Sequence, residues 1–105
     1  MDGARAKFSV GEVVEHRLFG YRGVVIDVDP DFQLSEDWYE QVARSRPPKD
    51  APWYHVLVQD SDAPRYVAEQ NLEPDDSGEP VRNAALPTFF DDFVDGRYVR
   101  SAPLN

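Results

Sequence analysis

The sequence has no cysteine, so neither a disulfide nor a thiolate metal site can form, and the composition suits a reducing compartment. It has two histidines, which are too few to hold a metal ion by themselves. It also lacks the run of about 18 apolar residues that a membrane-spanning helix needs, and its first residues, MDGARAKFSV, lack the apolar centre of a secretory signal. We therefore expect a cytoplasmic protein that binds no metal or other cofactor and has no membrane partner.

Positive charge is scarce. Eleven Lys and Arg stand against 20 Asp and Glu, a formal net charge of -9. The imbalance is largest in residues 60–95, which hold ten acidic and two basic side chains. Such an excess of negative charge repels a polyphosphate at long range, so a protein partner is favoured over a nucleic acid.

Catalytic motifs are absent as well. The sequence contains no nucleophile elbow, no phosphate-binding loop and no paired-acid motif. Gly20 and Gly23 lie close together, but two residues between them do not make a phosphate cradle. We expect a protein that is not an enzyme.

What the sequence does have is a series of short strand patterns. Residues 12–18 alternate between two faces, and residues 24–28 form a β-branched run in which Val24, Ile26 and Val28 are expected to share one face. Further strands are expected at WYHVLVQD, at RYVA and at a fragment around Leu72. Five short strands in about 65 residues predict a mainly β fold, a small, strongly bent antiparallel barrel.

Helical patterns lie outside these strands. SEDWYEQVARS, beginning at the capping residue Ser35, predicts a short inserted helix that RPPKDAP ends. Residues 74–85 are turn-forming and acidic and are expected to be a polar linker. Residues 86–105 form a phenylalanine-rich tail, in which an amphipathic helix would place its apolar groups on one face and end at Gly96.

The stretch HRLFGYRGVVIDVDP, residues 16–30, is the first candidate binding site. Arg17 and Arg22 flank Phe19 and Tyr21 around one glycine-hinged turn. Small barrels use such guanidinium and aromatic groups to contact phosphates and bases. The alternative is purely structural, because a hairpin that must turn sharply also needs its glycines.

For the other aromatic residues and for the histidines, the sequence leaves both a structural role and a binding role open. Strand aromatics such as Trp53 and Tyr54 form a core or a groove wall more often than a platform for bases. The histidines are either hydrogen-bonded inside the barrel or part of a recognition surface. The tail phenylalanines either pack on their own barrel or anchor in a groove of a partner or of another copy, which leaves a homo-oligomer open. The candidate partner-binding residues are His16, Arg17, Phe19, Tyr21, Arg22, Trp53, Tyr54 and His55, with tail contacts from Phe89, Phe90 and Phe93.

Three motifs, FGYRGVV, APWYHV and YVAEQNL, occur in this order at suitable spacings. On these motifs the chain resembles the heat-shock protein HspQ family, also described as the YccV-like hemimethylated-DNA-binding domain, over residues 6–73. The phenylalanine-rich segment after Pro87 has no counterpart in the family motif. The matching positions are Phe8, Gly11, His16, Gly20, Tyr21, Gly23, Val24, Val25, Asp29, Pro30, Trp53, Tyr54, His55, Val56, Tyr66, Ala68 and Leu72.

The resemblance implies an SH3-like β-barrel over residues 6–73 and a non-enzymatic accessory factor of stress proteolysis. Such a factor promotes degradation of the replication initiator DnaA and of denatured proteins, with the ATP-dependent protease Lon as the implicated machine. It also implies binding of hemimethylated origin DNA. Two hypotheses therefore stand, a protein-holding factor and a DNA-binding module, and any DNA binding is expected to be weak and to involve Arg17 and Arg22.

Overall fold

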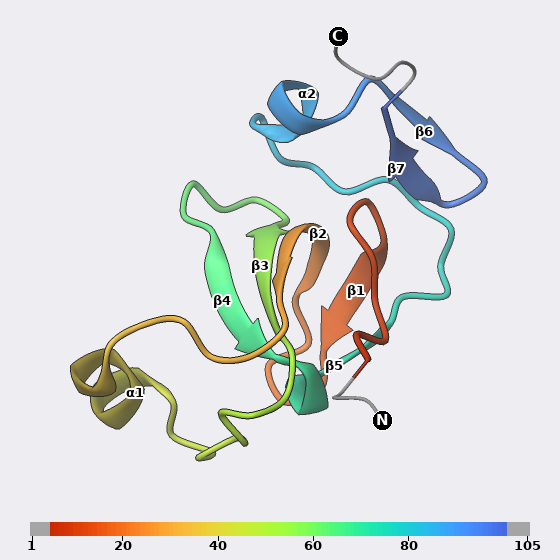
Figure 1. Cartoon of the computed structure of the whole chain (residues 1–105). Coiled ribbons are helices and arrows are strands. Elements are labelled where there is room, and N and C mark those ends of the chain that lie inside the picture. Colours follow the sequence, from red (N-terminus) through yellow and green to blue (C-terminus); the bar gives the residue numbers. More distant parts are fainter. Residues whose placement is uncertain (1–4, 101–105) are drawn as a thin grey trace, which may run out of the picture.

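The structure is a computed structural model that describes residues 5–100 of the chain (Figure 1). Its elements, in chain order, are β1 (Val13–His16), β2 (Arg22–Asp29), α1 (Glu36–Val42), β3 (Trp53–Val58), β4 (Arg65–Ala68), the 3-10 helix η1 (Glu69–Asn71), β5 (Leu72–Pro74), α2 (Leu86–Phe89), β6 (Asp92–Val94) and β7 (Arg97–Val99). The expected mainly β fold, with a short helix inserted before the third strand, is confirmed.

The first five strands form one antiparallel sheet in the order β4-β3-β2-β1-β5. The sheet is open, because no ladder joins its edge strands β4 and β5 among the residues described. The closed barrel that the sequence favoured is therefore not formed. The edges nevertheless lie close together in the chain, since η1 alone connects them. A three-residue connection between opposite edges requires a strongly bent sheet.

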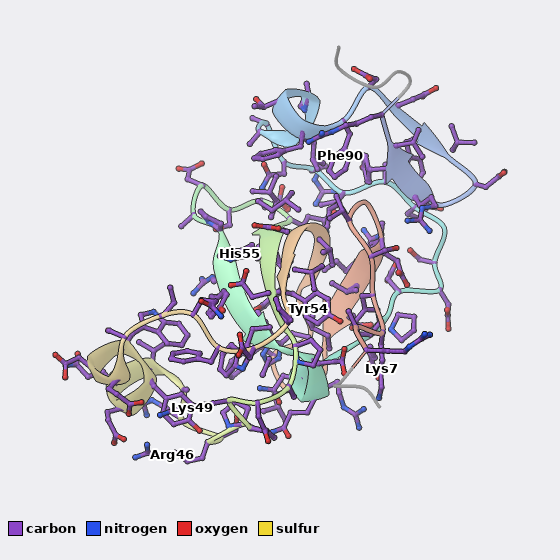
Figure 2. All side chains as sticks on the ribbon, viewed as in Figure 1. Lys7, Arg46, Lys49, Tyr54, His55 and Phe90 are labelled. Atoms are coloured by element: carbon purple, nitrogen blue, oxygen red, sulfur yellow. The ribbon has the colours of Figure 1, made fainter. Side chains whose placement is uncertain are left out.

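Both faces of the sheet are buried. On one face Phe8 from the N-terminal segment packs with Val14, Tyr54 and Val56, and on the other Val13 and Leu57 belong to a second cluster. A third cluster forms around α1, where Tyr39 and Ala43 pack against Trp53. Figure 2 shows Tyr54 within the sheet, surrounded by strands.

A β-bulge in β2 changes which side chains share a face. The pairing with β3 shifts register between Val25 and Asp27, so Ile26 lies at the irregular position. Val24 and Ile26 contact the second cluster, whereas Val28 packs on the first. The expectation that these three residues share a face was wrong for Val28, because the extra residue in a bulge reverses the alternation that follows it.

The expected amphipathic helix at the C-terminus is also corrected. Helix α2 ends at Phe89, and residues 92–99 form the hairpin β6–β7. Asp95 and Gly96 have positive φ angles of 53° and 83°, the conformation of a two-residue hairpin turn. Phe93 therefore does not extend a helix but lies 4.7 Å, between ring centroids, from Tyr98 on the paired strand.

This C-terminal part covers the second face of the sheet. Phe90 is 6% exposed and belongs to the second cluster with Leu86 and Tyr98, while Phe89 and Phe93 pack against that cluster. Figure 2 shows Phe90 between the C-terminal elements and the sheet. The phenylalanines thus follow the first of their two alternatives, packing on their own sheet.

Residues 74–85, expected to be a polar linker, are held to the sheet by specific contacts. Val81 is buried, and its N–H donates to the hydroxyl of Tyr98 at 2.8 Å. The Asn83 side-chain amide donates to the carbonyl oxygens of Val58 and Ser61. The segment is polar, as expected, but it lies against the sheet along this part of its course.

Gly11 joins the C-terminal hairpin to the sheet, which makes it a test of this packing. Its carbonyl accepts from the Tyr98 N–H at 2.8 Å, its φ is +96°, and an added Cβ would lie 2.1 Å from the Tyr98 carbonyl oxygen. We expect Gly11→Ala to lower the free energy of unfolding by more than about 2 kcal/mol. Gly20→Ala is the control, because φ there is also positive but a Cβ meets nothing within 4 Å, so the loss should be about 1 kcal/mol. Urea unfolding of both variants checks this, and equal losses would contradict the close approach.

Candidate functional site

A cavity of about 500 Å³ lies between the β1–β2 turn, α1 and the strands β3 and β4. We call it the groove. Its lining residues are His16, Leu18, Phe19, Tyr21, Leu34, Trp38, Val42, Ala43, Arg44, Ser45, Pro47, Trp53, His55, Pro64, Arg65, Tyr66, Val67 and Asn71. The set contains seven aromatic or imidazole rings and no carboxylate, on a chain with 20 acidic residues.

One wall of the groove is a set of stacked aromatic rings. Trp53 and Tyr66 are stacked with their ring centroids 5.2 Å apart, and Trp38 meets Tyr66 edge-on at 5.7 Å. The polar atoms of the stacked pair are already bonded: Trp53 Nε1 donates to the Pro48 carbonyl, and the Tyr66 hydroxyl donates to Asp29 at 2.7 Å. Burial, followed by this hydrogen bond, raises the pKa of Tyr66. The wall therefore offers a ligand mainly the apolar faces of its rings.

The rim of the groove is apolar and exposed. Leu18 and Phe19, in the β1–β2 turn, are 65% and 77% exposed, and Leu34, just before α1, and Val42, its last residue, are exposed as well. Of the six large exposed hydrophobic residues in the described part of the chain, four border this one cavity. Apolar groups gathered around a concavity, rather than scattered, are typical of an interaction site.

His16 fixes the turn that presents Phe19. Its Nδ1 accepts from the backbone N–H groups of Leu18 and Phe19, both at 3.1 Å, and its ring stacks on Phe19 at 4.5 Å. Gly20 closes the turn with φ +76° and an N–H that donates to the His16 carbonyl. Because a protonated Nδ1 cannot accept, the turn requires neutral His16. Burial lowers the pKa of His16, which favours the same form.

Arginines without partners border the groove. Within residues 5–100, the guanidinium groups of Arg17, Arg44 and Arg65 form no hydrogen bond or ion pair with another described residue, and Arg44 and Arg65 line the cavity. By contrast, Arg46 pairs with Glu40 and Arg82 with Asp60. The groove thus has positive charges at its border that no acidic side chain of the described residues neutralises by direct contact.

Arg22, a candidate from the sequence, points elsewhere. Its guanidinium binds both carboxylate oxygens of Asp75, at 3.1 and 3.0 Å, and donates to the carbonyls of Glu79 and Pro80. This hydrogen bonding lowers the pKa of Asp75. Arg22 therefore binds residues 75–80 of its own chain. Its guanidinium is engaged there, whereas the guanidinium of Arg17 forms no hydrogen bond or ion pair with another described residue.

The remaining candidates divide between core and groove. Tyr54 is completely buried, and its hydroxyl accepts from the Phe8 N–H and donates to Glu69. Trp53, His55 and Tyr21 line the groove. The sequence had not singled out the groove residues from α1 and β4. The signal was present in Trp38 and Val42, which are four residues apart and hence on one face of the helix.

One group of potential metal ligands is present in the described residues. Single ligand atoms of Asp27, Asp29 and His55 all lie within 4.8 Å of one another. Asp29 Oδ2 is already engaged, since it accepts from the Tyr66 hydroxyl and lies 3.2 Å from His55 Nε2. These contacts hold Asp29 and His55 together without an ion, and the absence of a bound metal stays a prediction.

The sequence of the chain matches the family described as "Hemimethylated DNA-binding protein YccV like" over residues 6–97. The chain belongs to the YccV-like family. The matched residues extend beyond the 6–73 seen from the motifs and include α2, β6 and the start of β7. That the YccV-like match runs through the tail agrees with the contacts of Phe90 and Tyr98, which make this segment part of the packed structure. In the described part of the chain no helix combines the length and apolarity needed to cross a membrane.

The neutral acceptor at His16 generates a pH prediction for this YccV-like chain. A histidine whose pKa is lowered by folding stabilises the native state above its ordinary value of about 6.5 and loses that contribution as the pH falls below it. We expect the urea midpoint to fall between pH 7.5 and pH 5, and to fall less in His16→Asn, whose side-chain oxygen can accept at the Nδ1 position without titrating. An unchanged pH dependence in that variant would contradict the assignment.

Proposed function

We propose that this YccV-like protein is a non-enzymatic binding module that holds an apolar segment of a protein partner in the groove. The observation that carries the proposal is the placement of exposed Leu18, Phe19 and Val42 around an aromatic-walled cavity. Following the resemblance to HspQ, we place its action in cytoplasmic stress proteolysis, where it promotes degradation of DnaA and of denatured proteins by Lon.

The size of the groove suits a transient contact. Covering about 300 Å² of apolar surface, counted on the groove and the bound segment together, contributes about 7.5 kcal/mol at about 25 cal/mol per Å². The loss of translational and rotational freedom on association removes several kcal/mol of this. Such a balance leaves affinities in the range of a factor that releases its client rather than of a permanent subunit.

Two features support a role without catalysis. His16 uses Nδ1 to accept two backbone N–H groups, and His55 lies against Asp29 and Tyr66. Within residues 5–100, neither histidine is hydrogen-bonded to a serine or threonine hydroxyl, the arrangement that activates a nucleophile. The aromatic wall likewise offers rings rather than reactive groups.

We further propose that the sheet is SH3-like. Its support is the connection of edge strand β4 to edge strand β5 by η1, which brings the two edges of a five-stranded antiparallel sheet together without a long loop. The β1–β2 turn lies beside η1, since the Arg17 N–H donates to the Asn71 carbonyl at 2.8 Å, and it lines the groove together with β4.

Degradation of a client by purified Lon tests the function. We expect the protein to accelerate degradation of DnaA or of a denatured protein, and Leu18→Ser with Phe19→Ser to remove most of the acceleration. Both side chains are exposed, so the fold should tolerate the change. Val94→Ser is the matched control, since Val94 is an exposed apolar residue on β6, outside the groove. Rates that the wild-type protein leaves unchanged for every client, or equal behaviour of the two variants, would refute the proposal.

Hemimethylated DNA is the second candidate ligand, favoured by the description of the family and by the unpartnered arginines beside aromatic rings. The net charge of -9 opposes it. We expect any binding to weaken steeply with salt, and to require Arg17, Arg44 and Arg65 rather than Arg22, whose guanidinium is occupied by Asp75.

Fluorescence anisotropy with hemimethylated, fully methylated and unmethylated duplexes checks this at several salt concentrations. Glutamine at Arg17, Arg44 and Arg65 should abolish binding, and Arg82→Gln should not. Tight, methylation-selective binding at physiological salt that survives the triple change would contradict a groove-centred DNA contact.

A further inference from the structure

Strand β4 is an unpaired edge of the described sheet. It pairs with β3 alone, and within the described chain residues 65–67 form no backbone hydrogen bond outside that ladder. The carbonyl of Ala68, the N-cap residue of η1, belongs to the first turn of that helix. The Glu69 N–H donates to the Pro52 carbonyl at 3.0 Å. Because hydrogen-bonded positions alternate in an antiparallel ladder, the N–H and C=O groups of Tyr66 and the N–H of Ala68 face away from β3 without a partner. The edge therefore has donors and acceptors without a strand partner.

The groove runs along this edge. Four consecutive residues, 64–67, line it, and among them Tyr66 packs with the α1 cluster whereas Val67 belongs to the cluster on the opposite face of the sheet. Successive side chains of a strand point to opposite faces. A cavity that contacts both must reach the backbone between them, so the unpaired edge opens into the groove. Figure 1 shows β4 at the margin of the sheet, with no strand on its outer side.

The charge at this place differs from that of the rest of the chain. Arg65 lies on β4 itself and Arg44 follows α1 on the facing side, both without partners in the described chain, and no Asp or Glu lines the cavity. Guanidinium groups bordering an apolar cavity favour a ligand that carries carboxylates next to apolar side chains.

We propose that the groove takes an extended acidic and apolar segment of a protein partner, which adds as a further strand to β4. Its backbone pairs with the N–H and C=O of Tyr66 and with the N–H of Ala68, its apolar side chains lie against Trp38 and Phe19, and its carboxylates meet Arg44 and Arg65. Strand addition of this kind takes affinity from main-chain hydrogen bonds and specificity from the side-chain sites beside them. The inference rests on the proposed function and names the class of segment that is held.

Three synthetic peptides of about eight residues test the charge preference. They share an apolar sequence and differ at a pair of positions that carry aspartate, asparagine or lysine. By fluorescence anisotropy we expect the aspartate peptide to bind about tenfold more tightly than the asparagine peptide, and the lysine peptide to bind most weakly. The double variant Arg44→Gln, Arg65→Gln should remove this difference, whereas Arg82→Gln, at a paired arginine outside the groove, should keep it.

Backbone methylation of the peptide tests strand addition without altering the protein. N-methyl groups placed at one residue after another should weaken binding about tenfold or more at alternate positions only, because alternate N–H groups point toward β4. An N-methyl scan with no effect, or with equal loss at every position, would overturn strand addition.

The outcomes separate the two levels of the proposal. Equal affinity for the three peptides, with Leu18→Ser and Phe19→Ser still abolishing binding, would overturn the acidic preference and leave the holding function standing. No binding of any peptide, together with no effect on degradation by Lon, would overturn both. A hemimethylated duplex that displaces the aspartate peptide and binds more tightly would assign the arginines to DNA and overturn the inference.

Discussion

The central strands are apolar on both sides, and this constraint governs how the rest of the chain is arranged. In β3, Tyr54 and Val56 face one cluster, while Leu57 and Trp53 face two others. Neither face can be left to water without a cost of about 25 cal/mol for each Å² of apolar surface. The N-terminal segment, α1 and the C-terminal hairpin each cover one part. The β4 edge and the β1–β2 turn are the places that this covering leaves open.

The same constraint explains how far the fold could be predicted. The five strands of the sheet and α1 follow from local alternation, capping and turn residues, all of which are visible in sequence. The reversal of faces at Val28 is not visible in the sequence, because a bulge depends on pairing with β3 rather than on β2 alone. The C-terminal hairpin did have a local signal in Asp95 and Gly96. It was outweighed by the helical spacing of the phenylalanines, although Asp-Gly is among the strongest hairpin signals.

The candidate site was predictable only where its residues are neighbours in the sequence. Aromatic and imidazole residues close to the glycine-hinged turn, such as His16 and Phe19, were recognised from their own neighbourhood. Arg44 and Arg65 were not recognised, since they are 21 positions apart in the numbering and only the fold makes both line the groove. Arg22 resembled Arg17 in sequence, and nothing local showed that Asp75, 53 residues away, would occupy it. Residues whose role is set by distant partners cannot be assigned from spacing.

The bond between Gly11 and Tyr98 has a consequence for biosynthesis. It joins segments 87 residues apart, so the segment that accepts it leaves the ribosome long before the strand that donates. Throughout that interval Val13, Val24 and Leu57 have no cover from Leu86 or Phe90. A nascent chain with a ready sheet and one bare face is open to aggregation and to chaperones. During its own synthesis the protein is therefore an incompletely folded chain, like the chains that we propose it binds.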